Sequence, residues 1–174
     1  MNTPNNRRRL QSMEQIESAF TQLIQQKELA QISVSELCKV CGLNRSTFYA
    51  NYTDIYDLAD RVRDRLEQEV GRLYESERTQ RFNSNDFLKL FRHIRENQLF
   101  YRTYFKLGYD ADHQVYLYDS ALARLHFENR HIEYHMEFFR SGFNAIVKLW
   151  LSNGCQETPE EMEEIIKSEY SGRQ

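Results

Sequence analysis

Apolar residues return every three or four positions along most of this chain, which is the spacing of one face of an α-helix. The pattern predicts a first helix at about 9–27 and a long helix that starts after Asp54 and runs to about 75. Five more helices are predicted at about 85–96, 98–107, 112–128, 131–152 and 159–170. A polar loop is expected at 78–85, with Ser84 as a cap for the helix that follows. Because Pro occurs only at positions 4 and 159 and Gly is sparse, we expect an all-α fold.

The most informative stretch is 33–52, which reads SVSELCKVCGLNRSTFYANY. Ser33 can cap a short helix, and Glu36 follows at the spacing of a capping box. Gly42 suits the left-handed exit from that helix, and Asn44 can cap a second helix at 45–49. Two short helices joined by a turn that contains Gly form a helix-turn-helix. In that motif the second helix enters the major groove of DNA.

This stretch resembles the helix-turn-helix of the TetR family of bacterial transcription regulators. Residues 133–162 look like the last two helices of the dimerisation domains in a small-bodied TetR subgroup. The resemblance implies a three-helix DNA-binding head at 1–53, joined by a long helix to a helical regulatory and dimerisation body at 54–174. We therefore expect a repressor that binds palindromic operator DNA as a homodimer, with a DNA affinity modulated through the body. The alternative is a regulator whose body docks a protein partner and activates transcription.

The second helix of the motif carries the candidates for reading DNA. Arg45 is the strongest, because its guanidinium can grip a guanine base through two hydrogen bonds. Asn44, Ser46 and Thr47 are short enough to let the helix sit deep in the groove. Phe48 should point into the core of the head.

Phosphate contacts are expected around this helix. Ser33 and Ser35 lie at a helix N-terminus, where backbone N–H groups and the helix dipole favour an anion. The basic residues 7–9 have two open interpretations, a frayed tail or a basic arm on phosphates or in the minor groove. Where the family often has a Lys that contacts the DNA backbone, this chain has Ile55, so that contact is lost or taken over by 7–9. With the family's phosphate-binding tyrosine included, the predicted DNA-binding residues are Arg9, Ser33, Ser35, Asn44, Arg45, Ser46, Thr47, Tyr49 and Tyr52.

The helix at 131–152 is apolar on two sides and therefore needs two partners. One partner is its own core, and the natural second is the same helix of another copy. One stripe consists of Ile132, Met136, Phe139, Phe143, Ile146, Val147 and Trp150, and the other of Tyr134, Phe138, Gly142, Ala145 and Leu149. The predicted dimer interface comprises Phe139, Gly142, Phe143, Ile146, Trp150, Met162, Ile165 and Ile166.

The family resemblance also implies a small-molecule effector pocket in the body, although the subgroup is small enough to bind a very small ligand, a protein or nothing. For each candidate taken alone, core packing is the simpler interpretation. The candidates are His93, Tyr101, Tyr104, Phe105, Tyr118, His131, Tyr134, His135 and Phe138.

Two short motifs raise other chemistry. Glu128, His131 and His135 share a helical face at metal-ligand spacing, but the second such motif of a di-iron bundle is missing. Cys38-x-x-Cys41 has the spacing of a redox or zinc motif, but no second pair accompanies it, so packed thiols are expected. With no phosphate loop or nucleophile motif either, we expect no enzyme, no metal and no cofactor.

The charge is unevenly distributed. The whole chain has a net charge of −3, yet residues 1–52 hold six Lys or Arg against four acids. A basic head on an acidic body suits a protein that touches phosphates at one end. No apolar run approaches 18 residues and no signal peptide is visible, so we expect a cytoplasmic protein with no membrane partner.

Overall fold

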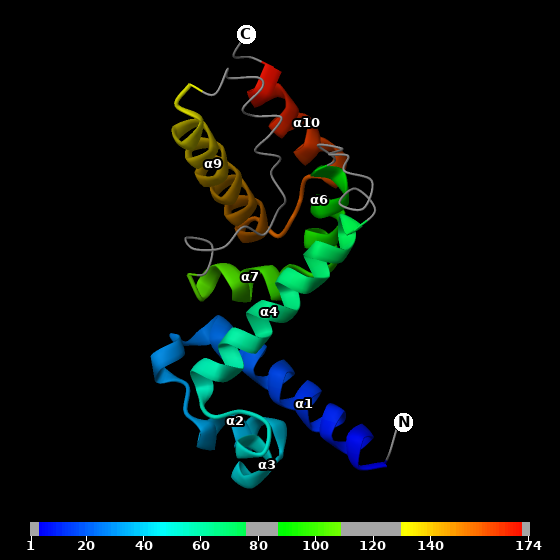
Figure 1. The fold of residues 1–174 in the computed structure, drawn as a ribbon, viewed down its shortest axis with the longest axis vertical. Coiled ribbons are helices and arrows are strands. Elements are labelled where there is room, and N and C mark those ends of the chain that lie inside the picture. Colours follow the sequence, from blue (N-terminus) through cyan, green and yellow to red (C-terminus); the bar gives the residue numbers. More distant parts are fainter. Residues whose placement is uncertain (1–3, 76–86, 109–129, 172–174) are drawn as a thin grey trace. The chain divides into compact units, whose positions relative to one another are not determined.

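The computed structural model describes residues 4–75, 87–108 and 130–171, and these form helices and their connections with no strand among them. The elements are α1 (Pro4–Gln26), the 3₁₀ helix η1 (Leu29–Gln31), α2 (Val34–Cys41), α3 (Arg45–Tyr49), α4 (Ile55–Leu73), α6 (Phe87–Glu96), α7 (Gln98–Lys106), α9 (Ile132–Ser152) and α10 (Pro159–Ser171) (Figure 1). The predicted all-α fold is confirmed. The predicted loop at 78–85 with its Ser84 cap, and the predicted helix at 112–128, lie outside the described residues.

Helix α1 begins at Pro4, five residues before the predicted start. Pro is tolerated in the first helical turn, because the N–H group it lacks has no partner there. As a result, Arg7, Arg8 and Arg9 lie on a helix with exposed side chains. The frayed-tail interpretation therefore does not describe these three residues, and the interpretation as a basic arm on phosphates stays a prediction.

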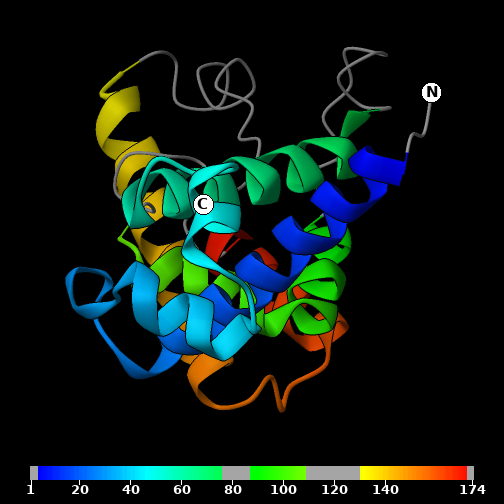
Figure 2. The same ribbon diagram turned by 90° about the horizontal axis from the view of Figure 1, so that it is seen from below.

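The helix-turn-helix forms as the local signals indicate, and α2 packs against both α1 and α3 (Figures 1 and 2). The hydroxyl of Ser33 accepts a hydrogen bond from the backbone N–H of Glu36 at 3.2 Å. The carboxylate of Glu36 pairs with Lys27, so the capping box is only half formed. Gly42 has the left-handed φ of 70° that ends α2.

The chain separates into two compact units, residues 1–67 with 102–109 and residues 68–101 with 110–174. The first unit has its core among α1, the helix-turn-helix and α4, with side chains that are fully buried. These include Ile16, Phe20, Leu37, Phe48 and Leu58. Helix α7 joins the first unit through Thr103, whose hydroxyl accepts a hydrogen bond from the side-chain amide of Gln25 at 2.9 Å.

The second unit is built on aromatic packing between α6 and α9, and α10 packs against α6. Phe91 of α6 lies 5.7 Å from Phe143 and 5.5 Å from Trp150 of α9, measured between ring centroids. The indole N–H of Trp150 donates to the backbone oxygen of Glu157 at 3.2 Å, which fixes the connection to α10. On the surface, Arg92 of α6 pairs with Glu160 of α10 at 2.7 Å.

Candidate nucleic-acid interface

Helix α3 presents a polar face to solvent, and the aromatic side chain on its other face packs into the core. Phe48 is fully buried, which confirms the prediction that it points into the core. Asn44, Arg45 and Ser46 are exposed, and Thr47 is half-buried. Asn44 occupies the N-cap position, but its side chain makes no capping hydrogen bond. Its amide therefore remains available to a base or a phosphate.

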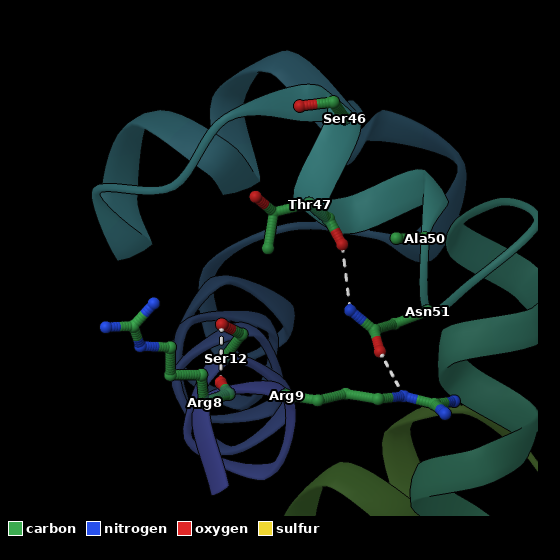
Figure 3. A pocket seen from close by; sticks show the side chains of 7 residues that line it. All are labelled: Arg8, Arg9, Ser12, Ser46, Thr47, Ala50 and Asn51. Atoms are coloured by element: carbon green, nitrogen blue, oxygen red, sulfur yellow. Dashed lines mark hydrogen bonds between the residues drawn. The ribbon is translucent and has the colours of Figure 1, made fainter. Parts of the chain in front are cut away.

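The basic start of α1 lies beside α3, and the two helices line an open pocket of about 450 Å³ (Figure 3). Its cations are Arg8 and Arg9, and the described residues that line it include no acid. The described residues that line it are Arg8, Arg9, Ser12, Ser46, Thr47, Ala50 and Asn51. Two cations next to the outward face of α3 give this surface a charge that suits a polyanion.

A buried amide connects the two sides of this pocket. The side chain of Asn51 donates to the backbone oxygen of Thr47 at 2.8 Å and accepts from Nε of Arg9 at 2.9 Å. Asn51 and Ser12 were not predicted as part of this surface. Nothing in the sequence signals the contact, because Arg9 and Asn51 are 42 positions apart.

Tyr52 requires a correction, since its side chain is only 2% exposed and cannot reach DNA. Its hydroxyl donates to Oε1 of Glu17 at 3.1 Å, and Arg65 of α4 pairs with the other oxygen of that carboxylate. The guanidinium of Arg61 lies 5.5 Å from the centre of the Tyr52 ring. Burial, with the carboxylate of Glu17 as a second cause, raises the pKa of Tyr52, so the hydroxyl stays neutral. Tyr52 is therefore a core residue that links α1 to the start of α4.

The remaining predicted residues near the motif differ in exposure. Tyr49 is 51% exposed, and Ser33 and Ser35 are exposed at the start of α2, although the hydroxyl of Ser33 already serves as the cap. Ile55 is buried, so it supplies no phosphate contact in place of the family's lysine. The residue before it, Asp54, caps α4, and its Oδ1 accepts hydrogen bonds from the backbone N–H groups of Tyr56 and Asp57 at 2.9 and 2.8 Å.

The candidates for an effector pocket differ in burial and belong to two compact units. Nδ1 of His93 lies 2.7 Å from the hydroxyl of Tyr101, and burial lowers the pKa of His93. Tyr104 and Phe105 belong to the other compact unit, where their ring centroids are 5.7 Å apart. On α9, Tyr134 is 76% exposed and Phe138 is 61% exposed, and His131 and His135 are exposed as well. Tyr118 lies outside the described residues.

Four residues of the predicted dimer interface lie in the core of the protomer itself. The side chains of Phe143, Trp150, Met162 and Ile166 are each no more than 3% exposed. Phe139, Gly142 and Ile146 are half-buried, and Ile165 is 41% exposed. The exposed apolar residues of α9 are those of the second stripe, namely Tyr134, Phe138, Ala145 and Leu149. A side chain that the core already covers has little area left for another copy, whereas this stripe of α9 is exposed to solvent.

The described residues give little basis for other chemistry. They contain no group of three or more His, Cys, Asp or Glu arranged to hold a metal, and Glu128 of the candidate motif lies outside them. Cys38 and Cys41 are free thiols, and burial raises the pKa of Cys38, as expected for packed side chains. None of the described helices combines the length and the apolar character needed to cross a bilayer.

Comparison with known proteins places the chain among regulators. Residues 84–169 match the TetR family model described as "Transcriptional regulator C-terminal region". The chain is 25% identical over 130 residues to the HTH-type dhaKLM operon transcriptional activator DhaS of Lactococcus lactis subsp. lactis (strain IL1403), covering 74% of this chain and 68% of the relative. A solved structure of the dihydroxyacetone kinase operon activator DhaS is 20% identical with a TM-score of 0.48, covering 90% of this chain and 92% of that one. The chain belongs to the TetR family of transcriptional regulators, which are not enzymes.

Proposed function

We propose that the chain binds palindromic operator DNA as a homodimer, with α3 in the major groove and the start of α1 on the adjoining phosphates. In this proposal residues 1–53 contact DNA and residues 54–174 regulate and dimerise. The observation that carries it is the surface in Figure 3, where Arg8 and Arg9 line one pocket with Ser46 and Thr47 of α3. In DNA recognition, contacts to phosphates position the protein and contacts to bases specify the sequence. Here the two arginines of α1 are suited to the first role and the exposed face of α3 to the second.

The second stripe of α9 supports the homodimer. Tyr134, Phe138 and Leu149 are each more than 60% exposed, and Ile165 of α10 adds a further exposed apolar side chain. A large apolar side chain left in water gains roughly 1.5–3 kcal/mol when it is fully buried. Two-fold pairing of this stripe with its copy would bury it, and a two-fold dimer matches the symmetry of a palindromic operator.

The direction of regulation is the finer question, and we propose that the chain activates transcription. The sequence led us to expect a repressor, but the relative DhaS is named an activator. That name favours the alternative, in which the body docks a protein partner. The body remains the proposed site of control, whether a small molecule or a protein occupies it.

Selection of duplexes from a randomised DNA pool tests the binding proposal. We expect enrichment of two half-sites related by two-fold symmetry, with centres about one helical turn, or roughly 10 base pairs, or a multiple of it apart. Absence of any enriched sequence, or a chain that stays monomeric when bound, would overturn the proposal. A reporter driven by the natural upstream DNA then gives the direction, since loss of an activator lowers transcription and loss of a repressor raises it.

A further inference from the structure

Asn51 is a polar residue with almost no access to water. It follows α3 in the turn that leads to α4, and it is 8% exposed. Both ends of its amide are bonded, with the nitrogen donating to the carbonyl of Thr47 and the oxygen accepting from Nε of Arg9 (Figure 3). Because Asn and Gln carry a donor and an acceptor on one rigid group, a single amide can fix the distance between two elements. Here it ties the start of α1 to the recognition helix.

This bond leaves a specific part of Arg9 for a ligand. A guanidinium has five N–H donors in a fixed fork, and Asn51 takes the one on Nε. The two terminal amino groups form the opposite edge, which matches a phosphate in a bidentate arrangement. The side chain of Arg9 is exposed apart from this anchor. A held side chain also loses less conformational entropy on binding than a mobile one.

The electrostatics of α1 point to an anion at the same place. The first turn of α1 contains no acidic residue, and Arg7, Arg8 and Arg9 follow at once. A phosphate placed beside these side chains would meet three positive charges near one end of α1. As far as the structure describes the lining, the pocket offers neutral hydroxyls and cations and has no carboxylate that would repel a phosphate.

We propose that Asn51 is a positioning residue that holds Arg9 so that its outer edge binds one backbone phosphate beside the groove entered by α3. Asn51 itself does not touch the DNA. This inference rests on the proposed function, because it assumes that α3 enters the groove. Beyond that function, the inference states that the hydrogen bonds from Arg9 to Asn51 and from Asn51 to Thr47 fix the position of the phosphate contact relative to the base-reading helix.

A double-mutant cycle tests the inference, with the duplex that the wild-type chain selects as the probe. If Asn51 acts through Arg9, Asn51→Ala weakens binding by about tenfold in the wild-type background and has little effect in the Arg9→Ala background. Each single variant should lower the slope of log K against log salt by about 0.9, the contribution of one phosphate, and the double variant by no more. Arg8→Ala is the matched control, because Arg8 lines the same pocket with its guanidinium pointing away from Asn51 (Figure 3). Its effect and that of Asn51→Ala should add.

The outcomes separate the inference from the function on which it rests. Equal losses from Asn51→Ala in both Arg9 backgrounds, or no loss at all, would overturn the positioning role while leaving the DNA-binding proposal in place. A wild-type chain that selects no duplex would overturn both. If Asn51→Ala does not fold, Arg9→Lys decides, because one ammonium group cannot both donate to Asn51 and present a two-pronged edge. We expect Arg9→Lys to bind within about threefold of Arg9→Ala, and full retention of affinity would show that charge alone suffices.

Discussion

Arg45 stands at the first position of α3, exposed above the buried ring of Phe48. A guanidinium in that place is suited to bind a guanine, so its loss should lower the affinity mainly for the cognate sequence. We expect Arg45→Ala to weaken cognate binding by about 1–3 kcal/mol and to relax specificity, measured by competition between the selected duplex and a scrambled one. Lys39→Ala, which removes an exposed charge from α2, is the control and should affect both duplexes equally. An equal effect from Arg45→Ala would contradict its role as a base reader.

Tyr52 and Tyr49 give a matched pair for separating stability from DNA contact. Tyr52→Phe removes a buried hydrogen bond to the carboxylate of Glu17 and should lower the free energy of unfolding by about 1–3 kcal/mol in urea titrations. Its DNA affinity should not change, because the ring does not reach the surface. Tyr49→Phe should show the reverse, with unchanged stability and weaker DNA binding, since that side chain is 51% exposed. Weaker binding by Tyr52→Phe at unchanged stability would restore Tyr52 to the DNA-binding set.

These residues also show where sequence reasoning succeeds and where it ends. The buried position of Phe48 and the exposed positions of Asn44 and Arg45 could be predicted because this stretch resembles the helix-turn-helix of the family. The burial of Tyr52 depends on Glu17, which lies 35 positions earlier in the chain. The role of Asn51 depends in the same way on a distant arginine. A polar side chain becomes a core residue only when such a partner exists, and the partner is visible only in the fold.

The predicted helix bounds are close where local end signals were used, and the start of α1, which was placed by apolar periodicity without using Pro4, is not close. The cap Ser33 and the exit Gly42 place α2 at Val34–Cys41, and Pro159 marks the start of α10. Helix α1 extends back through the polar residues 4–8, which carry no apolar periodicity to reveal it. Hydrophobic spacing therefore located the buried part of α1 and missed the turns that carry its arginines.

Within α9, Gly142 is an unusual residue for a helix interior. A methyl group added there would meet no atom within 4 Å in the protomer, so the protomer gives no steric reason for Gly. We expect Gly142→Ala to raise the free energy of unfolding of the monomeric form by about 1 kcal/mol through helix propensity. If α9 approaches a second copy closely at this point, the same change should also raise the dimer dissociation constant in sedimentation experiments. Gly71→Ala in α4, which is equally open, should stabilise without changing dimerisation.

At the level of the whole molecule, the sequence showed that α9 has two apolar stripes but not which one the protomer buries. Both stripes repeat at helical spacing, and the choice depends on where α6 and α10 pack. The structure buries Phe143 and Trp150, which both contact Phe91 of α6, and leaves Phe138 and Leu149 exposed. The predicted interface combined residues of both stripes because hydrophobic spacing alone cannot assign a partner to a face.

Leu149→Glu tests the exposed stripe as the dimer surface. Leu149 is 61% exposed, so the substitution should leave the stability of the protomer within about 0.5 kcal/mol. It would place like charges across a two-fold interface, so we expect a monomer in light scattering and weaker binding to the palindromic duplex. Leu99→Glu is the matched control on α7, where the leucine is 46% exposed. A Leu149→Glu chain that remains dimeric would place the interface elsewhere.

Of the five residues of α3, only Phe48 is buried. The packing of α3 against the core thus depends on the ring of Phe48, and the side chains at 44–47 are not needed for it. It follows that the DNA sequence specificity of this head can be changed. Exchanging the side chains at 44–47 should redirect the regulator to a different promoter while the rest of the protein folds unchanged.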